Sequence, residues 1–239
     1  MRGWRAGCAV YRRLPRPRIV DMADSGKSTR KFCYACGRAA TTKEHVPPQC
    51  LFPPGYRSHL VTVPSCAEHN NANSKDVEYV RGILLSLAQL GSNSKPVFDA
   101  MMRSIDRRPH LVSTMFQDLQ PIQIEGHETA AFTVDLPRFD KVITAIARAI
   151  HYRDFNEKRR DWDVFCPHFY QSGSAASKRD AYDPLREVAA IQKYVYAPSD
   201  APEVFCYGRA GKSPGRSVYQ FVFYDVMIVF AWPYLRHWR

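Results

Sequence analysis

Two short motifs of metal-binding residues constrain the fold of this 239-residue chain more than any other feature. Cys33 and Cys36 have two residues between them, and Cys66 and His69 repeat that spacing after 29 intervening residues. Two residues between ligands allow a tight turn to direct both side chains at one ion, and four such ligands match tetrahedral zinc. The pattern therefore predicts a structural zinc ion held by Cys33, Cys36, Cys66 and His69.

Other residues of the same stretch leave the ligand set open at one position. Either Cys50 or His59 could replace one of the four ligands. The chain has seven cysteines, an odd number that does not suit a disulfide framework, and it lacks the apolar segment of a secretory signal. We therefore expect reduced thiols and a cytoplasmic location.

The first 31 residues are strongly basic. They contain nine Lys/Arg and two Asp/Glu, so they contribute +7 to the formal net charge of +11. Their prolines and the lack of an apolar period predict a disordered arm over residues 1–31. This arm either binds phosphates or is a dispensable leader ahead of a start at Met22. Since only +4 remains for the rest of the chain, net charge is weak support for nucleic-acid binding.

The remaining sequence divides into two predicted units, and the expected fold class is α+β. Residues 32–92 hold nearly all the candidate ligands in short segments broken by prolines, which is typical of a small zinc-stabilised module. Within it, residues 60–64 have strand composition, and apolar residues at helical spacing predict a helix that is capped by Asn73 and ends at Gly91. Residues 93–239 are expected to form a mixed α+β C-terminal domain.

Local patterns predict several elements in this C-terminal part. Its final segment, residues 217–235, is the most apolar, but Gln220 and Asp225 interrupt it, and its β-branched and aromatic residues favour strands over a membrane helix. We therefore expect no membrane association. The other expected elements are strands in 121–126, 130–137 and 161–170, a helix from Phe139 to Ile150, and a helix near 183–196.

Three residues of the first unit are surplus to a purely structural zinc site. Glu44 and His45 precede a double proline between the two ligand pairs, and Asn70 directly follows the last ligand. A carboxylate and an amide oxygen are hard ligands that suit Mg²⁺ or Mn²⁺, and a neutral imidazole beside them can take a proton from water. Together these groups would suit phosphodiester hydrolysis.

The order of these motifs resembles that of the HNH, or ββα-metal, endonucleases in their zinc-containing form. The resemblance covers residues 32 to about 90 and consists of "CYAC", then "EHVPP", then "CAEHN" at the start of a helix. It implies a ββα-metal fold, with His45 as the general base and with Glu44 and Asn70 as ligands of a catalytic Mg²⁺ or Mn²⁺. It also implies that the four Cys/His residues hold a structural zinc, and that the partner is nucleic acid, with DNA as the expected substrate.

The sequence departs from that family's pattern at three positions. Glu44 stands where Asp is common, His69 stands where Cys is common, and Asn70 stands where the last histidine would be. Asn71 could supply the amide oxygen in place of Asn70. The alternative functions are a zinc-containing nucleic-acid-binding module without cleavage activity and an interaction protein whose zinc module is only structural.

Overall fold

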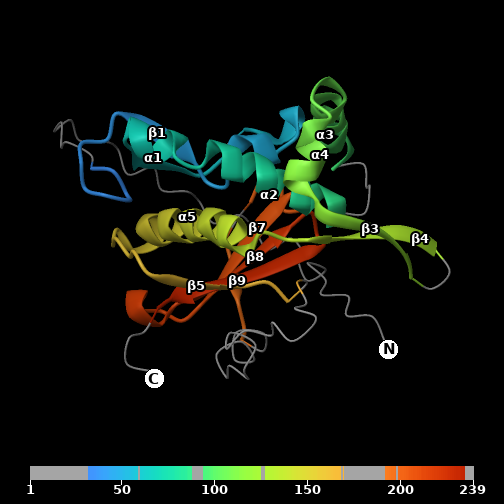
Figure 1. The fold of residues 1–239 in the computed structure, drawn as a ribbon. Helices are drawn as coiled ribbons and strands as arrows, with labels where there is room; N and C mark the ends of the chain where they lie inside the picture. Colours follow the sequence, from blue (N-terminus) through green and yellow to red (C-terminus); the bar gives the residue numbers. More distant parts are fainter. Residues whose placement is uncertain are drawn as a thin grey trace.

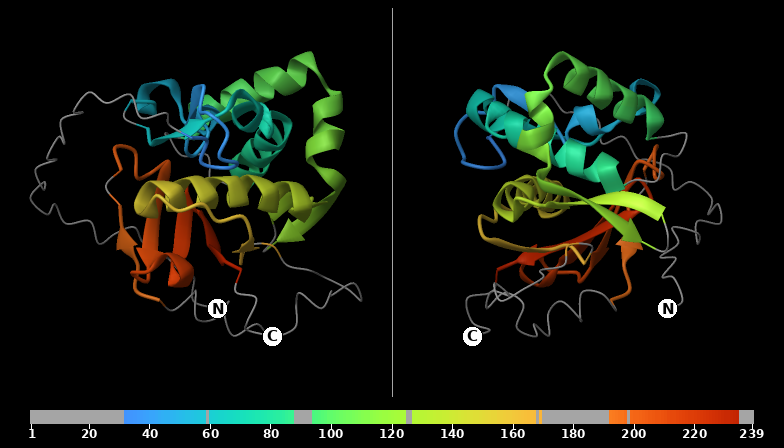
Figure 2. Two further views of the ribbon diagram at one scale, coloured as in Figure 1. Left: turned by 90° about the vertical axis from the view of Figure 1, so that its left-hand side faces the viewer. Right: turned by 45° about the vertical axis from the view of Figure 1, so that its right-hand side comes forward.

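The computed structural model describes residues 32–58, 60–87, 94–124, 127–167, 169, 192–197 and 199–234. Three layers are visible in the ribbon diagrams (Figure 1, Figure 2). Strands and helices of the N-terminal half form the upper layer, helix α5 (Leu136–Phe155) crosses the middle, and a five-stranded sheet forms the lower layer. The predicted α+β class is confirmed.

The upper layer begins with the order strand, strand, helix. Its two strands pair antiparallel, with Glu44 opposite Val63, and the connection between them contains two 3-10 helices. Two α-helices then follow the second strand. The bounds are β1 (Thr42–His45), η1 (Gln49–Leu51), η2 (Pro54–Tyr56), β2 (Thr62–Ser65), α1 (Ala67–Asn71) and α2 (Ser74–Leu87).

The predicted strand and helix of this layer are both present. The strand expected at 60–64 is β2, which begins at Thr62. The expected helix is α2; its apolar stripe is buried, and Val80, Ile83 and Leu84 are at most 1% exposed. Asn73 lies immediately before it and accepts the backbone N–H of Val77 at 2.7 Å, while Gly91 lies outside the described residues.

Two helices and a ribbon connect the upper layer to α5. The helices are α3 (Lys95–Arg107) and α4 (His110–Met115), and the ribbon pairs β3 (Gln117–Ile124) with β4 (His127–Thr133). The sequence-based prediction includes the ribbon strands but neither helix. The ribbon extends away from the three layers (Figure 1).

The lower layer is an antiparallel sheet of strand order β5-β9-β8-β7-β6. The predicted strands at 161–170 and in the apolar C-terminal segment are present in it. Its strands, with the 3-10 helix that follows β7, are β5 (Trp162–Phe165), β6 (Val195–Tyr196), β7 (Phe205–Ala210), η3 (Pro214–Arg216), β8 (Val218–Phe223) and β9 (Met227–Pro233).

The prediction of a helix near 183–196 is wrong at its C-terminal end. Residues 183–191 lie outside the described part of the chain, but Val195 and Tyr196 form β6 and pair with Arg209 and Gly208 of β7. A Cβ atom on Gly208 would lie 2.8 Å from the Cβ atom of Tyr194. The side chains of Tyr194 and Tyr196 therefore lie over Gly208, and pairing with β7 overrides the local helical pattern.

One buried hydrophobic cluster includes residues from both predicted units. It contains Leu51 and Ile83 of the first unit and Phe139, Tyr219 and Phe221 of the second, all at most 2% exposed. The boundary between residues 92 and 93 stays a prediction. Among the residues that the structure describes, no helix combines the length and the apolar character needed to cross a bilayer.

A charged contact joins α2 to α5. The Asp76 carboxylate is 17% exposed and accepts Arg138 Nε at 2.9 Å and Lys141 Nζ at 2.7 Å. Burial raises the pKa of the Asp76 carboxyl, but the hydrogen bonds from Lys141 and Arg138 outweigh burial, so this pKa lies below its usual value. The charged form of Asp76 therefore helps to hold α5 against the upper layer.

We expect Asp76→Asn to reduce the free energy of unfolding by about 1–2 kcal/mol at neutral pH. Because the folded-state pKa is lowered, this stabilisation is present above the usual carboxyl pKa and is lost as the pH falls through the lowered value. Urea unfolding at neutral and at acidic pH measures both effects. Asp99→Asn is the matched control, because Asp99 pairs with Lys95 and is more exposed than Asp76. An equal loss at both pH values would show that the ion pair is not responsible.

Candidate functional site

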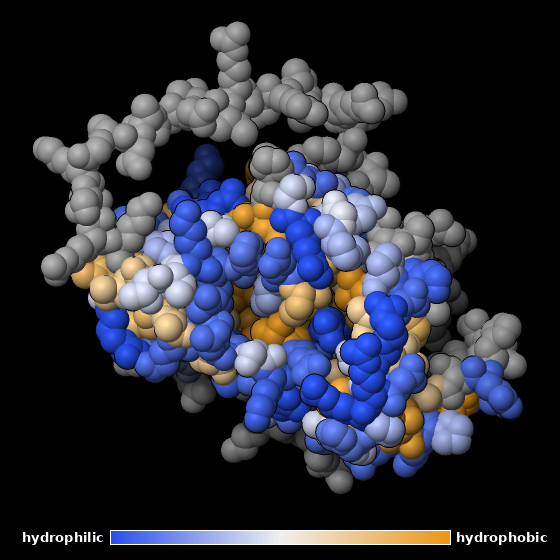
Figure 3. Space-filling model, turned by 90° about the horizontal axis from the view of Figure 1, so that it is seen from above, coloured by the Kyte–Doolittle hydropathy of each residue, from blue (hydrophilic) through white to orange (hydrophobic). Residues whose placement is uncertain are grey.

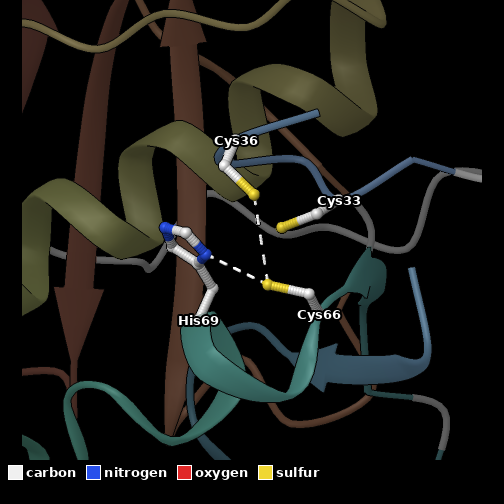
Figure 4. A group of neighbouring side chains, drawn as sticks. All are labelled: Cys33, Cys36, Cys66 and His69. Carbon is white, nitrogen blue, oxygen red and sulfur yellow. Dashed lines mark hydrogen bonds between the residues drawn. The ribbon is translucent and has the colours of Figure 1, made fainter. Parts of the chain in front are cut away.

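The two predicted ligand pairs come from two different turns. Cys33 and Cys36 lie in a turn in which Cys33 N–H donates to Arg38 O at 2.8 Å and Gly37 N–H donates to Cys33 O at 3.1 Å. Gly37 has φ of +83°, a value that glycine adopts without a steric penalty. Cys66 is the N-cap residue of α1, and His69 lies within that helix. Each turn thus presents two side chains toward the other (Figure 4).

The four side chains form a cluster with the dimensions of a zinc site. The ligand atoms of Cys33, Cys36, Cys66 and His69 all lie within 4.8 Å of one another. Cys36 Sγ is 4.0 Å from Cys66 Sγ, which is 3.2 Å from His69 Nδ1. With Zn–S bonds of about 2.3 Å, neighbouring sulfur atoms of a tetrahedral site lie about 3.8 Å apart. The cluster could therefore bind a zinc ion.

Neighbouring groups favour the thiolate form of Cys36, the form that a metal requires. Arg38 Nε lies 3.5 Å from Cys36 Sγ, and this hydrogen bond lowers the pKa of the Cys36 thiol to about 7. The Arg38 guanidinium also pairs with Glu68. The backbone N–H of Ala35 donates to Cys33 Sγ at 3.4 Å. The contacts with Arg38 stabilise negative charge on Cys36 Sγ. At Cys66 the backbone hydrogen bond of His69 lowers the pKa of the thiol, but burial and the thiols of Cys33 and Cys36 outweigh it and raise this pKa above its usual value.

Of the two alternative ligands, Cys50 is among the described residues and His59 is not. Cys50 lies outside the group of four, and burial raises the pKa of its thiol, which disfavours the thiolate.

A pocket beside the cluster brings together the three surplus residues. Glu44, His45 and Asn70 line one pocket of about 240 Å³. Glu44 and His45 come from the end of β1, and Asn70 comes from α1, where its N–H donates to Cys66 O at 3.0 Å. The next residue, Asn71, is exposed and is not among the residues that line the pocket.

The start of α2 and one face of α5 complete the pocket wall. Ser74, the first residue of α2, and Val77 line it, as do Val142 and Ile146 of α5. The sequence did not predict the α5 face as a pocket wall. The local pattern of a helix does not indicate that it packs next to a strand about 90 residues earlier in the chain.

Glu44 is held by side chains that sequence reasoning also missed. Ser65 Oγ donates to Glu44 Oε2 at 3.2 Å, and the Tyr34 side chain forms a further hydrogen bond with this carboxylate. Burial raises the pKa of the Glu44 carboxyl above its usual value, and the hydrogen bonds from Tyr34 and Ser65 and the charge of Arg148 offset this rise only in part. A cation bound next to Glu44 would act in the same direction as Arg148 and favour the carboxylate.

The pairing of β1 with β2 could have predicted the contact between Ser65 and Glu44. Because Val63 lies opposite Glu44, Ser65 is two residues further along the same face of the hairpin and within reach of the carboxylate. No comparable pattern predicts the position of Arg148. Its Nη2 donates to Ala35 O at 3.0 Å and so attaches α5 to the turn that carries the first ligand pair.

No family model matches the chain, and it has no match among curated proteins or solved structures. Any functional conclusion therefore depends on the cluster and the pocket themselves.

Proposed function

We propose that this chain is a metal-dependent endonuclease of the HNH, or ββα-metal, type, which hydrolyses phosphodiester bonds in nucleic acid, with DNA as the expected substrate. One observation carries the proposal: Glu44, His45 and Asn70 line a single pocket beside a Cys₃His cluster, on a segment with the order strand, strand, helix. The cluster has a structural role in this proposal, because three thiolates and one imidazole would fill all four positions of a tetrahedral zinc ion.

His45 is assigned the proton-transfer role. A neutral imidazole can accept a proton from a water molecule and so produce the nucleophile that attacks the scissile phosphorus. Hydrogen bonds from Ser65 and Tyr34 fix the orientation of the Glu44 side chain. We therefore assign Glu44 the role of a metal ligand and leave proton transfer to His45.

Glu44 and Asn70 are assigned a second metal ion, which is distinct from the zinc. Their oxygen donors suit Mg²⁺ or Mn²⁺, and an amide oxygen together with a carboxylate is an ordinary donor set for such hard cations. When bound there, a divalent ion would reduce the negative charge on the scissile phosphate and on the leaving 3′ oxygen. Ser74 lines the same pocket at the N-terminus of α2, where the partial positive charge of a helix also favours a phosphate.

Cleavage assays with and without divalent ions test the proposal. We expect the purified chain to cut plasmid DNA in Mg²⁺ or Mn²⁺ and not in EDTA, with single-stranded DNA and RNA as further substrates. Zinc analysis of the EDTA-treated protein separates loss of the second ion from loss of zinc. Asn70→Ala should reduce cleavage and regain part of it at high Mn²⁺, because it weakens the site for the hard cation. Asn71→Ala, a change of the exposed neighbour, should cut at the unaltered rate.

A protein that cuts none of these substrates with any divalent ion would contradict the proposal. Retained binding of DNA or RNA in a gel-shift assay would then favour a binding module, and loss of both activities would favour an interaction protein.

A further inference from the structure

A second pocket lies next to the proposed catalytic pocket. Most of the charged residues that line it are basic. Its volume is about 570 Å³, and its lining includes Arg57, Arg81, Lys95, Arg103 and a single carboxylate, Asp99. Lys95 and Asp99 pair with each other at 3.2 Å, so three arginine side chains remain in excess. The pocket therefore favours an anion.

Arg81 is the strongest indication that an anion belongs there. Its side chain is only 16% exposed, and its nearest carboxylate oxygen, on Glu78, is 3.9 Å away, which is longer than a hydrogen bond. Arg81 Nε is buried and has no hydrogen-bond partner among the described residues. Leaving a buried guanidinium nitrogen without a hydrogen-bond partner is unfavourable, and an anion in the pocket that Arg81 lines would offset this cost by binding the same guanidinium.

The other cations come from different elements that converge on the same space. Arg57 follows η2, and its Nε donates to Phe52 O at 2.9 Å, which fixes the orientation of the guanidinium. Lys95 is the first residue of α3, and Arg103 lies two turns further along that helix. The N-terminus of α3 adds its partial positive charge to the same pocket.

The two pockets are adjacent along α2. Cys50 lines both of them; Ser74 and Val77 line the first, and Arg81 lines the second. Ser74 and Arg81 are seven residues apart on one face of the helix, which corresponds to about 10 Å along its axis. Figure 3 looks down on this layer and shows a hollowed face with hydrophilic side chains around hydrophobic ones.

We propose that the second pocket binds a backbone phosphate of the substrate strand. The separation of about 10 Å along α2 exceeds the axial rise of about 3.4 Å between successive phosphates of one strand, so the second pocket would hold a phosphate near the scissile one and not the scissile phosphate itself. The inference rests on the proposed nuclease function, because it takes the first pocket as the position of the scissile phosphate.

Arg103→Gln tests the inference with little risk to the fold, because Arg103 is exposed. We expect kcat/KM on duplex DNA to fall about 10-fold, mainly through KM, because one charged hydrogen-bonding contact is lost. Hydrolysis of bis(p-nitrophenyl) phosphate should be unchanged, since this small diester has no neighbouring phosphate. In a His45→Ala background, where cleavage does not interfere, the slope of log affinity against log salt should become shallower by about 1.

Arg108→Gln is the matched control. Arg108 is exposed and directly follows α3, and it does not line the pocket, so the same change in charge should leave kcat/KM and the salt slope near those of the unaltered protein. Arg103→Glu should exceed Arg103→Gln in both effects.

The outcomes separate the inference from the function on which it rests. If plasmid is cut but Arg103→Gln and Arg108→Gln have the same salt slope, the second pocket does not bind phosphate and the nuclease proposal stands. If the slope becomes shallower but nothing is cut, the pocket binds phosphate and the nuclease proposal is overturned. A protein that binds no nucleic acid overturns both.

Discussion

Replacing His45 by alanine should lower the rate of nucleic-acid cleavage by about 10²–10⁴-fold, while zinc content, folding and nucleic-acid binding stay near those of the unaltered protein. The reason is that His45 lines the pocket at the end of β1 but is not one of the four clustered metal-binding residues. Removing its imidazole takes away the proposed proton acceptor without opening the zinc site. The loss should appear in kcat, measured with saturating plasmid and Mg²⁺ or Mn²⁺.

Two comparisons make the His45 result specific. His110→Ala removes an exposed histidine of α4 and should cut at the unaltered rate. Added Mn²⁺ should restore part of the activity of Asn70→Ala but little of that of His45→Ala, because no group would remain to accept the proton. A His45→Ala protein that cuts as fast as the unaltered chain would refute the mechanism.

The elements that were predictable from sequence depend on local spacing. Each of the two ligand pairs is set by one short turn, and the apolar stripes of α2 and α5 follow from a period that a helix imposes on its own sequence. The position of Asn70 beside the pocket also follows locally, because it is the residue after His69 in α1.

The parts that were not predictable depend on contacts between distant segments. The helix α3 is an exception, because Val97, Met101 and Ile105 recur at helical spacing and its own sequence contains the pattern of a helix. β6 is a strand because β7 is available to pair with it. Arg148 and the α5 wall contact the surroundings of Glu44 only after α5 has packed against the upper layer, and Tyr34 reaches Glu44 only through the pairing of its turn with β2.

Contacts of this kind also connect the zinc cluster to the pocket. Loss of the zinc should therefore displace residues that are not zinc ligands. Ser65, which donates to Glu44, directly precedes Cys66, and Asn70 directly follows His69. Arg148 connects α5 to Ala35, which lies between the first two ligands. The positions of Glu44, Asn70 and α5 are therefore all fixed relative to the cluster.

Cys66→Ser should accordingly remove the zinc, unfold the segment from residue 32 to residue 87, and abolish cleavage. Binding of a structural zinc contributes about 10–16 kcal/mol in peptides that fold only with the metal, so we expect a loss of stability of at least about 5 kcal/mol even though the segment shares its buried cluster with the rest of the chain. Metal analysis should find one zinc per unaltered chain and none per variant, and hydrogen exchange should show lost protection in β1, β2 and α2.

Cys50→Ser, a matched change of a cysteine outside the cluster, should keep one zinc and nearly full stability. An unaltered protein that is fully folded without zinc, or a Cys50→Ser protein that loses the metal, would refute the assignment of these four ligands, because a site closed by Cys33, Cys36, Cys66 and His69 has no position left for Cys50.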